Sequence, residues 1–243
     1  MAEALDGYLT IWERKPVLRT VYDDFYQRIA TRCIPGLTIE IGGGIGNLKR
    51  RLGHVVSTDI QFAPWLDCVA DAQHLPFADA AVSNIVMVDV LHHVEFPVRF
   101  FREAERLLRP GGRIIMVEPA ITVGSTMFYR LIHHEPVMMG ADSLRDGTPD
   151  PDRNPYASNQ AIPTLIATRD RKHFCAQFPA LEITRVDWFS FFVYPLSGGF
   201  NSWSLMPASW AGPLLKIERA LEVVLGPWMG FRMMLVVEKA ARS

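Results

Sequence analysis

The chain has 243 residues, 49% of them hydrophobic, and a formal net charge of −1 at pH 7. This length suits one large α/β domain, and mixed charges without a basic face argue against a nucleic-acid partner. Three cysteines without C-x-x-C spacing predict neither a disulfide framework nor a zinc site. The sequence shows no signal peptide and no apolar run near the ~18 residues that span a bilayer, so we expect a cytoplasmic protein.

The first predicted element is an amphipathic helix over residues 15–32, because Val17, Val21, Phe25 and Ile29 recur every four residues. It precedes the first strand and is placed to cover a ligand cleft. Strands are then predicted at residues 37–41, 55–60, 68–70, 82–88 and 113–118, with helical stretches between them. This alternation is typical of a parallel sheet with right-handed crossovers.

The clearest predicted helix begins near Pro97 and places Val98, Phe101, Ala104 and Leu108 on one face. We expect the run Pro110-Gly111-Gly112 to end it. The polar residues 140–155 predict a flexible connection or a mobile lid. Two final strands are predicted at residues 181–192 and 231–238, on either side of an aromatic segment rich in glycine and proline.

Candidate site residues gather where the first predicted strand breaks into glycines, at Gly42, Gly44 and Gly46. A strand that turns abruptly into a helix while its backbone touches a ligand needs residues without a Cβ atom. Glu40 ends this buried strand, and its carboxylate requires a partner, for which a cationic ligand is one candidate. Asp59 follows at the tip of the neighbouring strand, where an acid can accept both hydroxyl protons of a ribose.

A dinucleotide site is the main alternative, because a glycine turn followed by an acid about 20 residues later is also its fingerprint. The spacing argues against it. The pattern G-x-G-x-x-G requires a third glycine at Asn47 when counted from Gly42, or at Lys49 when counted from Gly44. Neither position is a glycine.

Five segments in order carry a family resemblance: Glu40-x-Gly42-x-Gly44-x-Gly46, Asp59, residues 70–77 (ADAQHLPF), residues 89–94 (DVLHHV) and residues 108–112 (LRPGG). Together they resemble a class I S-adenosylmethionine-dependent methyltransferase of the type-11 group. The resemblance implies a Rossmann-like, doubly wound, seven-stranded sheet of order 3-2-1-4-5-7-6, with the last strand antiparallel. It also implies a single methyltransferase domain over 1–243. We divide it into a helical cap (1–35), a cofactor-binding core (36–120) and substrate-side segments (121–180 and 193–230).

The resemblance also implies roles for residues around S-adenosylmethionine, whose product is S-adenosylhomocysteine. Gly42 and Gly44 would lie beneath the methionine part, and Glu40 would meet its amino group or hold the turn. Asp59 would bind the ribose hydroxyls. The remaining expected cofactor residues are Gly43 and Gly46 in the turn, Ile60 against the adenine face, Asp71 and Ala72 at the adenine edge, and Val88, Asp89 and His93 near the methionine end. The alternatives are a turn residue at Asp71 and a capping or core-edge residue at Asp89.

The implied chemistry is an in-line displacement at the sulfonium methyl, in which positioning supplies most of the rate and a base helps only when the acceptor must lose a proton. The candidates for this base are His92, His133 and His134, each of which could instead be a packed or surface histidine. No metal is expected, because His133, His134 and Glu135 are adjacent and their side chains point in divergent directions.

The acceptor is indicated only by the aromatic residues 188–200 with Trp203 and Trp210. They suit a small apolar or lipid-linked acceptor, methylated on oxygen or carbon in preference to nitrogen, and a peripheral contact with a membrane surface. The stripe of Leu214, Ile217, Leu221 and Val224 that follows is expected to be ordinary core. Two other classes stay open, namely a catalytically silent S-adenosylmethionine-binding regulatory module and an NAD(P)-dependent oxidoreductase. The sequence indicates no oligomeric state.

Overall fold

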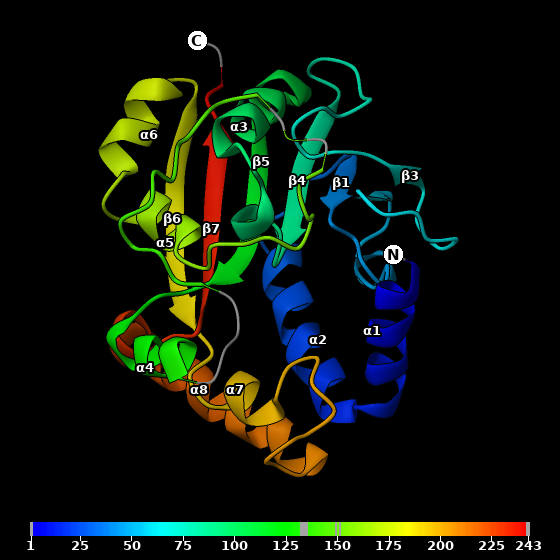
Figure 1. Ribbon diagram of the computed structural model, residues 1–243, viewed down its shortest axis with the longest axis vertical. Coiled ribbons are helices and arrows are strands. Elements are labelled where there is room, and N and C mark those ends of the chain that lie inside the picture. The colour runs from blue at the N-terminus through cyan, green and yellow to red at the C-terminus, as the bar shows by residue number, and fades with distance from the viewer. Residues whose placement is uncertain (1, 132–135, 149, 151, 242–243) are drawn as a thin grey trace.

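The computed structural model describes residues 2–131, 136–148, 150 and 152–241, and its centre is a sheet of seven strands within those residues (Figure 1). The strand order is β3-β2-β1-β4-β5-β7-β6. The pairs from β3 to β5 are parallel, whereas β7 runs antiparallel to both neighbours. The predicted order and the antiparallel last strand are therefore confirmed. The strands are β1 Thr38–Ile41, β2 Val55–Asp59, β3 Cys68–Val69, β4 Val82–Val88, β5 Leu108–Pro119, β6 Leu181–Phe189 and β7 Arg232–Lys239.

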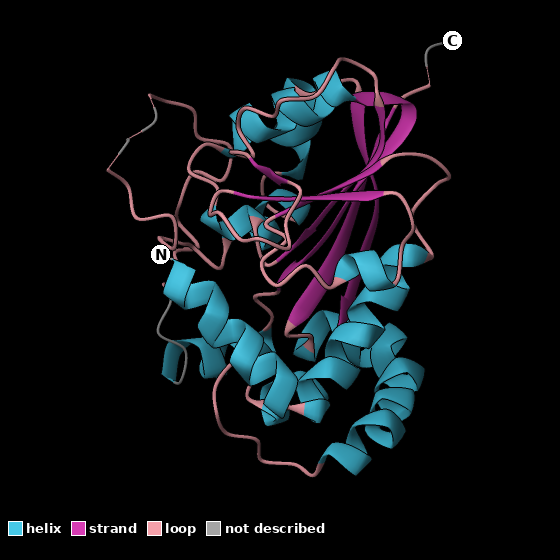
Figure 2. Ribbon diagram, turned by 90° about the vertical axis from the view of Figure 1, so that its right-hand side faces the viewer, coloured by secondary structure: helices cyan, strands magenta, loops and turns pink. Residues whose placement is uncertain are grey.

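Helices cover both faces of the sheet, and several gather beyond the carboxyl ends of its parallel strands (Figures 1 and 2). Strand β5 shows the two faces clearly, because Ile114 and Met116 pack with α3, α5 and α6 while Ile115 and Val117 pack with α2 and α8. Strands buried on both sides read as continuous apolar runs, which is why this one did so in the sequence. The helices are α1 Ala2–Arg14, α2 Pro16–Ala30, α3 Pro97–Leu107, α4 Val123–Leu131, α5 Ile162–Ala167, α6 Arg171–Gln177, α7 Val193–Ser197 and α8 Ala208–Met229.

Helices α2 and α3 follow the predicted patterns. Each begins with a proline in its first turn, where the missing N–H costs no helical hydrogen bond. The stripe from Val17 to Ile29 is buried in one hydrophobic cluster, and Val98, Phe101 and Ala104 are buried in the other. These two amphipathic predictions are confirmed.

The connections between the early strands differ from the prediction of helical stretches. A single 3₁₀ turn, Leu48–Arg50, follows β1, and the described chain has no helix between β2 and β4. The links there are short and contain Pro64 and Pro76, which interrupt helical hydrogen bonding. Consequently the connections from β1 to β4 are formed mainly by loops.

The start of β5 also differs from the prediction. Helix α3 ends at Leu107, and the run Pro110-Gly111-Gly112 lies inside the longer strand. The pairing with β4 shifts register there, from Val82 opposite Leu108 to Asn84 opposite Arg113, and Gly111 has a φ of 75°. A left-handed glycine at a register shift is characteristic of a β-bulge, so this run bends a strand and does not cap a helix.

The apolar stripe on α8 is mostly exposed, whereas it was predicted to be buried. Leu214 is half-buried, but Ile217, Leu221 and Val224 are exposed, and the side of α8 that packs on the protein carries Ala211, Leu215 and Glu218. The reading of this stripe as ordinary core is therefore wrong. The reason is that a helical pattern marks an apolar face without saying what covers it.

No helix within the described ranges combines the length and the apolar composition needed to cross a membrane.

Candidate functional site

The glycine turn after β1 approaches other backbone closely. Gly42 and Gly44 have φ values of 66° and 50°, in the left-handed region that favours glycine. A Cβ atom on Gly42 would lie 2.3 Å from a methyl group of Val90, whereas one on Gly44 would meet no atom closer than 3.9 Å. The backbone N–H of Gly43 donates to the carbonyl of Thr58 at 2.8 Å. The turn is thus bound to β2 on one side and open on the other.

A cavity of about 690 Å³ lies on this open side, at the carboxyl end of the parallel strands. We call it the main cavity, and its volume is in the range of small-molecule sites. Most of the predicted site residues line it: Glu40, Gly42, Gly43, Gly44, Asp59, Ile60, Val88, Asp89, His92 and His93. The structure therefore brings together residues from β1, β2 and β4 that are up to 53 positions apart, counting from Glu40 to His93.

The predicted adenine-edge residues lie in an adjoining cavity of about 100 Å³, which shares Asp59 and Ile60 with the main one. Asp71 accepts a hydrogen bond from the backbone N–H of Gln73 at 2.9 Å, so it also holds its own turn. Gly46 lines neither of these two cavities. A Cβ atom on Gly46 would lie 3.0 Å from the Trp65 ring, and φ is 70°, so this glycine allows the turn to pack against Trp65.

Two carboxylates flank the glycine turn. Asp59 accepts hydrogen bonds from the backbone N–H groups of Gly44, at 3.0 Å, and Gln61, at 2.9 Å. Glu40 is 5% exposed and accepts a hydrogen bond from the hydroxyl of Ser57. Burial raises the pKa of Glu40 to about 7, although the Ser57 hydrogen bond and Lys49 oppose the shift. Glu40 can therefore change charge near neutral pH.

The segment after β4 is held by residues that sequence reasoning missed. Asp89 has a φ of 59° and pairs with Arg232 from the start of β7, and it accepts a hydrogen bond from the Tyr22 hydroxyl at 3.2 Å. Arg232 is 4% exposed and lies 4.1 Å over the Tyr194 ring. Left-handed backbone at a non-glycine residue is strained and persists only where its surroundings hold it. No local sequence signal links β4 to β7, so only the sheet order could reveal this cluster.

Glu118, which sequence reasoning also did not identify, is completely buried beside the same segment. Its carboxylate accepts from the backbone N–H groups of Val90, at 2.9 Å, and Leu91, at 2.7 Å. Its other oxygen lies 2.7 Å from Nδ1 of His92. A proton on Nδ1 that donates to this carboxylate fixes the tautomer, and Nε2 is then the basic nitrogen. His133 and His134, the other predicted base candidates, lie outside the described residues.

Residues 39–116 match a family described as methyltransferase domain. Norajmaline N-methyltransferase of Rauvolfia serpentina is 26% identical over 122 residues, which cover 49% of this chain and 36% of that protein. The 27-O-demethylrifamycin SV methyltransferase of Amycolatopsis mediterranei is 40% identical over 47 residues, covering 19% and 17%. Residues 39–116 thus carry the sequence of a methyltransferase domain.

A solved S-adenosylmethionine-dependent methyltransferase from Thermotoga maritima has the same fold, with a TM-score of 0.58. It is 16% identical, and the match covers 98% of this chain and 100% of that one. Among the curated relatives, the chain spans about a third of the first and less than a fifth of the second. S-adenosylmethionine is the cofactor that this methyltransferase domain implies.

The main cavity of the methyltransferase domain fits that cofactor. The open turn at Gly44 leaves room for a ligand, and Glu40 offers a buried carboxylate to a cationic group. Gln61 lines the same cavity, and its buried side-chain oxygen has no hydrogen-bond partner among the residues that the structure describes, while its amide nitrogen donates to the Tyr156 hydroxyl at 2.6 Å. A buried polar atom without a partner is costly unless a ligand satisfies it.

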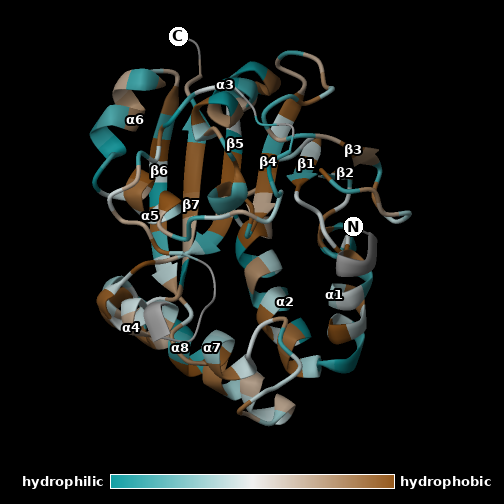
Figure 3. Cartoon of the chain, in the orientation of Figure 1, coloured by the Kyte–Doolittle hydropathy of each residue, from teal (hydrophilic) through white to brown (hydrophobic). Residues whose placement is uncertain are grey.

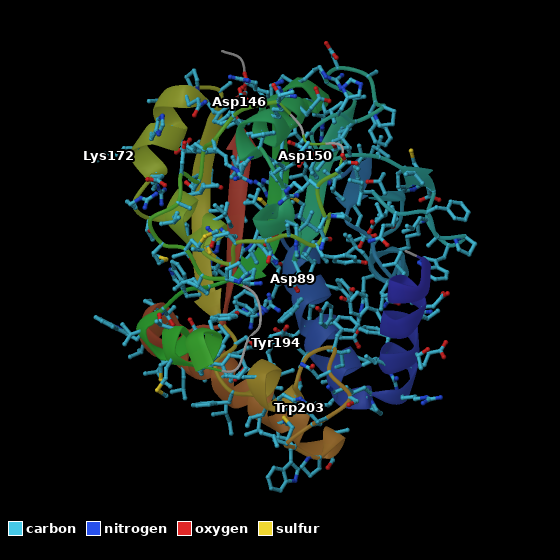
Figure 4. All side chains as sticks on the ribbon, viewed as in Figure 1. Asp89, Asp146, Asp150, Lys172, Tyr194 and Trp203 are labelled. Atoms are coloured by element: carbon cyan, nitrogen blue, oxygen red, sulfur yellow. The ribbon has the colours of Figure 1, made fainter. Side chains whose placement is uncertain are left out.

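The far wall of the main cavity is aromatic. Tyr22, Tyr194 and Phe200 belong to it, and Phe200 packs edge-on against Tyr22 with ring centroids 5.5 Å apart. Figure 4 shows Asp89, Tyr194 and Trp203 following one another from the sheet edge towards the loop beyond α7. That loop is anchored by Lys15, whose Nζ donates to the carbonyls of Gly199, Asn201 and Trp203 at 2.7, 2.8 and 2.7 Å. The linker between the two N-terminal helices therefore holds this loop in place through the buried Lys15.

Proposed function

We propose that this protein transfers the methyl group of S-adenosylmethionine to an oxygen or carbon atom of a small apolar acceptor by in-line displacement. The observation that carries the proposal is the composition of the main cavity. The glycine turn, Glu40 and Asp59 line it together with the aromatic rings of Tyr22, Tyr194 and Phe200. A cofactor beside the acids and an acceptor beside the rings would meet near Asp89 and His92.

The proposed cofactor roles follow the lining of the two cavities. Glu40 would face the amino group of the methionine part, and Asp59 would accept the ribose hydroxyls beside the open turn at Gly44. Ile60 is 54% exposed towards the space that the two cavities share, which suits contact with a flat base. The other proposed cofactor residues are Gly42, Gly43, Asp71, Ala72, Val88, Asp89 and His93, whereas Gly46 supports the turn without lining either cavity.

The cofactor, when bound, supplies a methyl group on a positively charged sulfur, so the leaving group is activated before the acceptor arrives. The protein therefore has to align the acceptor with the methyl group and exclude water, and such alignment can supply ~7–11 kcal/mol. The aromatic wall and the loop held by Lys15 are the parts of this chain placed to do so. The aromatic rings of this wall offer flat apolar surface, which supports an apolar acceptor.

We infer that His92 is the base where the acceptor must lose a proton. It lines the main cavity, and because its Nδ1 pairs with the buried Glu118, Nε2 is the nitrogen that we propose takes that proton. Glu118 also stabilises the imidazolium that forms, and because it binds the N–H groups of Val90 and Leu91 it keeps the ring in place. Glu118 is thus proposed as a positioning residue. His133 and His134 stay predicted alternatives.

The decisive experiment uses a methyl donor labelled with a heavy isotope. Purified protein is incubated with the donor and a cell extract, and the products are separated by mass spectrometry. We expect one labelled small molecule with release of S-adenosylhomocysteine, and its fragmentation identifies the atom that received the methyl group. Binding of S-adenosylhomocysteine without any labelled product would favour a silent regulatory module. Tight binding of NAD or NADP in calorimetry would favour an oxidoreductase.

A further inference from the structure

Helix α8 exposes an apolar stripe along its whole length. Trp210, Ile217, Val224 and Trp228 are 60%, 54%, 68% and 65% exposed. At 100° per residue these four side chains fall within roughly 40° of arc, so they form one narrow line on the helix surface. Figure 3 shows hydrophobic colouring on this helix at the outside of the molecule, away from the sheet. Apolar side chains in a continuous line on a surface indicate a partner.

The apolar surface continues onto α4, which packs against the end of α8. A Cβ atom on Gly124 would lie 3.0 Å from the Cα atom of Met229, so the two helices are in direct contact. Val123 and Met127 of α4 are 76% and 69% exposed. We call these six residues, Val123, Met127, Trp210, Ile217, Val224 and Trp228, the α4–α8 face.

The acidic and basic side chains of α8 differ in exposure. Neither carboxylate of α8 is an exposed, unpaired charge, because Glu218 is buried and accepts from the N–H of Val193 at 2.8 Å, and Glu222 pairs with Arg28 at 2.5 Å. Lys216 is exposed and forms no ion pair with any residue that the structure describes. An apolar face on a helix that also exposes a cation and turns its acids inward is complementary to an anionic lipid surface.

The ends of the stripe favour lipid over a protein partner. Trp210 and Trp228 are 18 positions apart, which is roughly 27 Å along the helix. Tryptophan is enriched where hydrocarbon meets lipid headgroups, since its ring is apolar and its N–H remains in a polar layer. A helix with a tryptophan at each end of one apolar line is suited to lie flat in that layer.

We propose that the α4–α8 face binds the surface of a bilayer that contains anionic lipids. Residues Phe128 and Tyr129, next to Met127 on α4, line the main cavity. The face therefore adjoins the wall of the cavity, and an apolar acceptor dissolved in the bilayer would have a short route into it. This last step rests on the proposed function, whereas the membrane contact itself does not.

The test is sedimentation with vesicles of phosphatidylcholine alone and of phosphatidylcholine with phosphatidylglycerol. We expect the wild-type chain to sediment with the anionic vesicles. The triple variant Trp210→Gln, Ile217→Gln and Val224→Gln should bind them at least tenfold more weakly. Lys216→Glu should weaken binding to anionic vesicles by about fivefold or more and leave the zwitterionic ones unchanged, since each basic residue near such a surface contributes about a factor of five.

The matched control is Phe62→Gln, because Phe62 is 70% exposed but follows β2, outside the α4–α8 face. It should bind vesicles as the wild-type chain does. Calorimetry with S-adenosylhomocysteine checks that each variant is folded, and it separates failure of the cofactor assignment from failure of the membrane proposal. The proposal is overturned if the wild-type chain ignores both kinds of vesicle. It is equally overturned if sedimentation velocity shows a dimer that the triple variant abolishes while vesicle binding is unchanged.

Discussion

Glu40 should make cofactor binding depend on pH. Its buried carboxyl has a pKa of about 7 in the free protein, chiefly because burial disfavours the charged form. If Glu40 faces the amino group of the methionine part, binding favours the ionised carboxylate. At lower pH the ligand then has to bind the small fraction of protein that is already ionised, or displace a proton. Affinity should therefore rise as the pH rises through 7.

The magnitude follows from the fraction of Glu40 that is ionised. A group with a pKa of about 7 is ~3% ionised at pH 5.5 and ~76% ionised at pH 7.5, so the affinity should change about 25-fold, or ~1.9 kcal/mol. The range ends at pH 7.5 because an α-amino group itself titrates at about 7.7–8.0. Within it most of the ligand keeps its positive charge.

The assay is isothermal titration calorimetry with S-adenosylhomocysteine at several pH values. Two controls isolate the proposed contact. The ligand 5′-deoxy-5′-methylthioadenosine lacks the amino-acid part, and the variant Glu40→Gln cannot ionise, so each should give an affinity that is nearly constant with pH. A flat profile for the wild-type protein with S-adenosylhomocysteine would refute the reasoning, as would an unchanged slope in Glu40→Gln.

Three further outcomes are expected. Because the pKa of Glu40 is raised from 4.5 to about 7, ionising it destabilises the free protein, so Glu40→Gln should increase the free energy of unfolding at pH 8 by up to about 3 kcal/mol and leave it unchanged below pH 4.5, as urea denaturation can measure. Asp59→Ala should weaken S-adenosylhomocysteine binding at least tenfold, and a change within twofold would remove the ribose role. His92→Ala should lower kcat by roughly 10²–10⁴ at saturating cofactor once an acceptor is known. Glu118→Gln should shift the pH profile of kcat, an effect that loss of packing alone would not produce.

Much of the fold was predictable because its signals are local. The apolar runs of β1, β2 and β4 mark strands buried on both faces, and the four-residue spacing from Val17 to Ile29 marks the inner face of α2. The glycine turn was equally readable, since Gly42 has no room for a Cβ atom beside Val90. Each of these features follows from a few consecutive residues.

The lining of the main cavity was predictable only at the glycine turn and at the acids that follow the parallel strands. Glu40, Asp59 and Asp89 end their strands at one edge of the sheet, so strand order alone brings them together. The partners that hold Asp89 and His92 in place come from distant parts of the chain. Arg232 reaches Asp89 because β7 lies beside β5, and Glu118 reaches His92 because β5 lies beside β4.

The amino-acid sequence by itself determined the strands, the glycine turn and the acids around it, because steric freedom and hydrophobic period act between neighbouring residues. Only the tertiary structure decided that Glu118 orients His92 and that the apolar line on α8 faces outward. The physical reason is that burial and pairing depend on residues that are distant in the sequence but close in space. A repeating pattern can mark an apolar face, but the rest of the chain determines whether that face is covered.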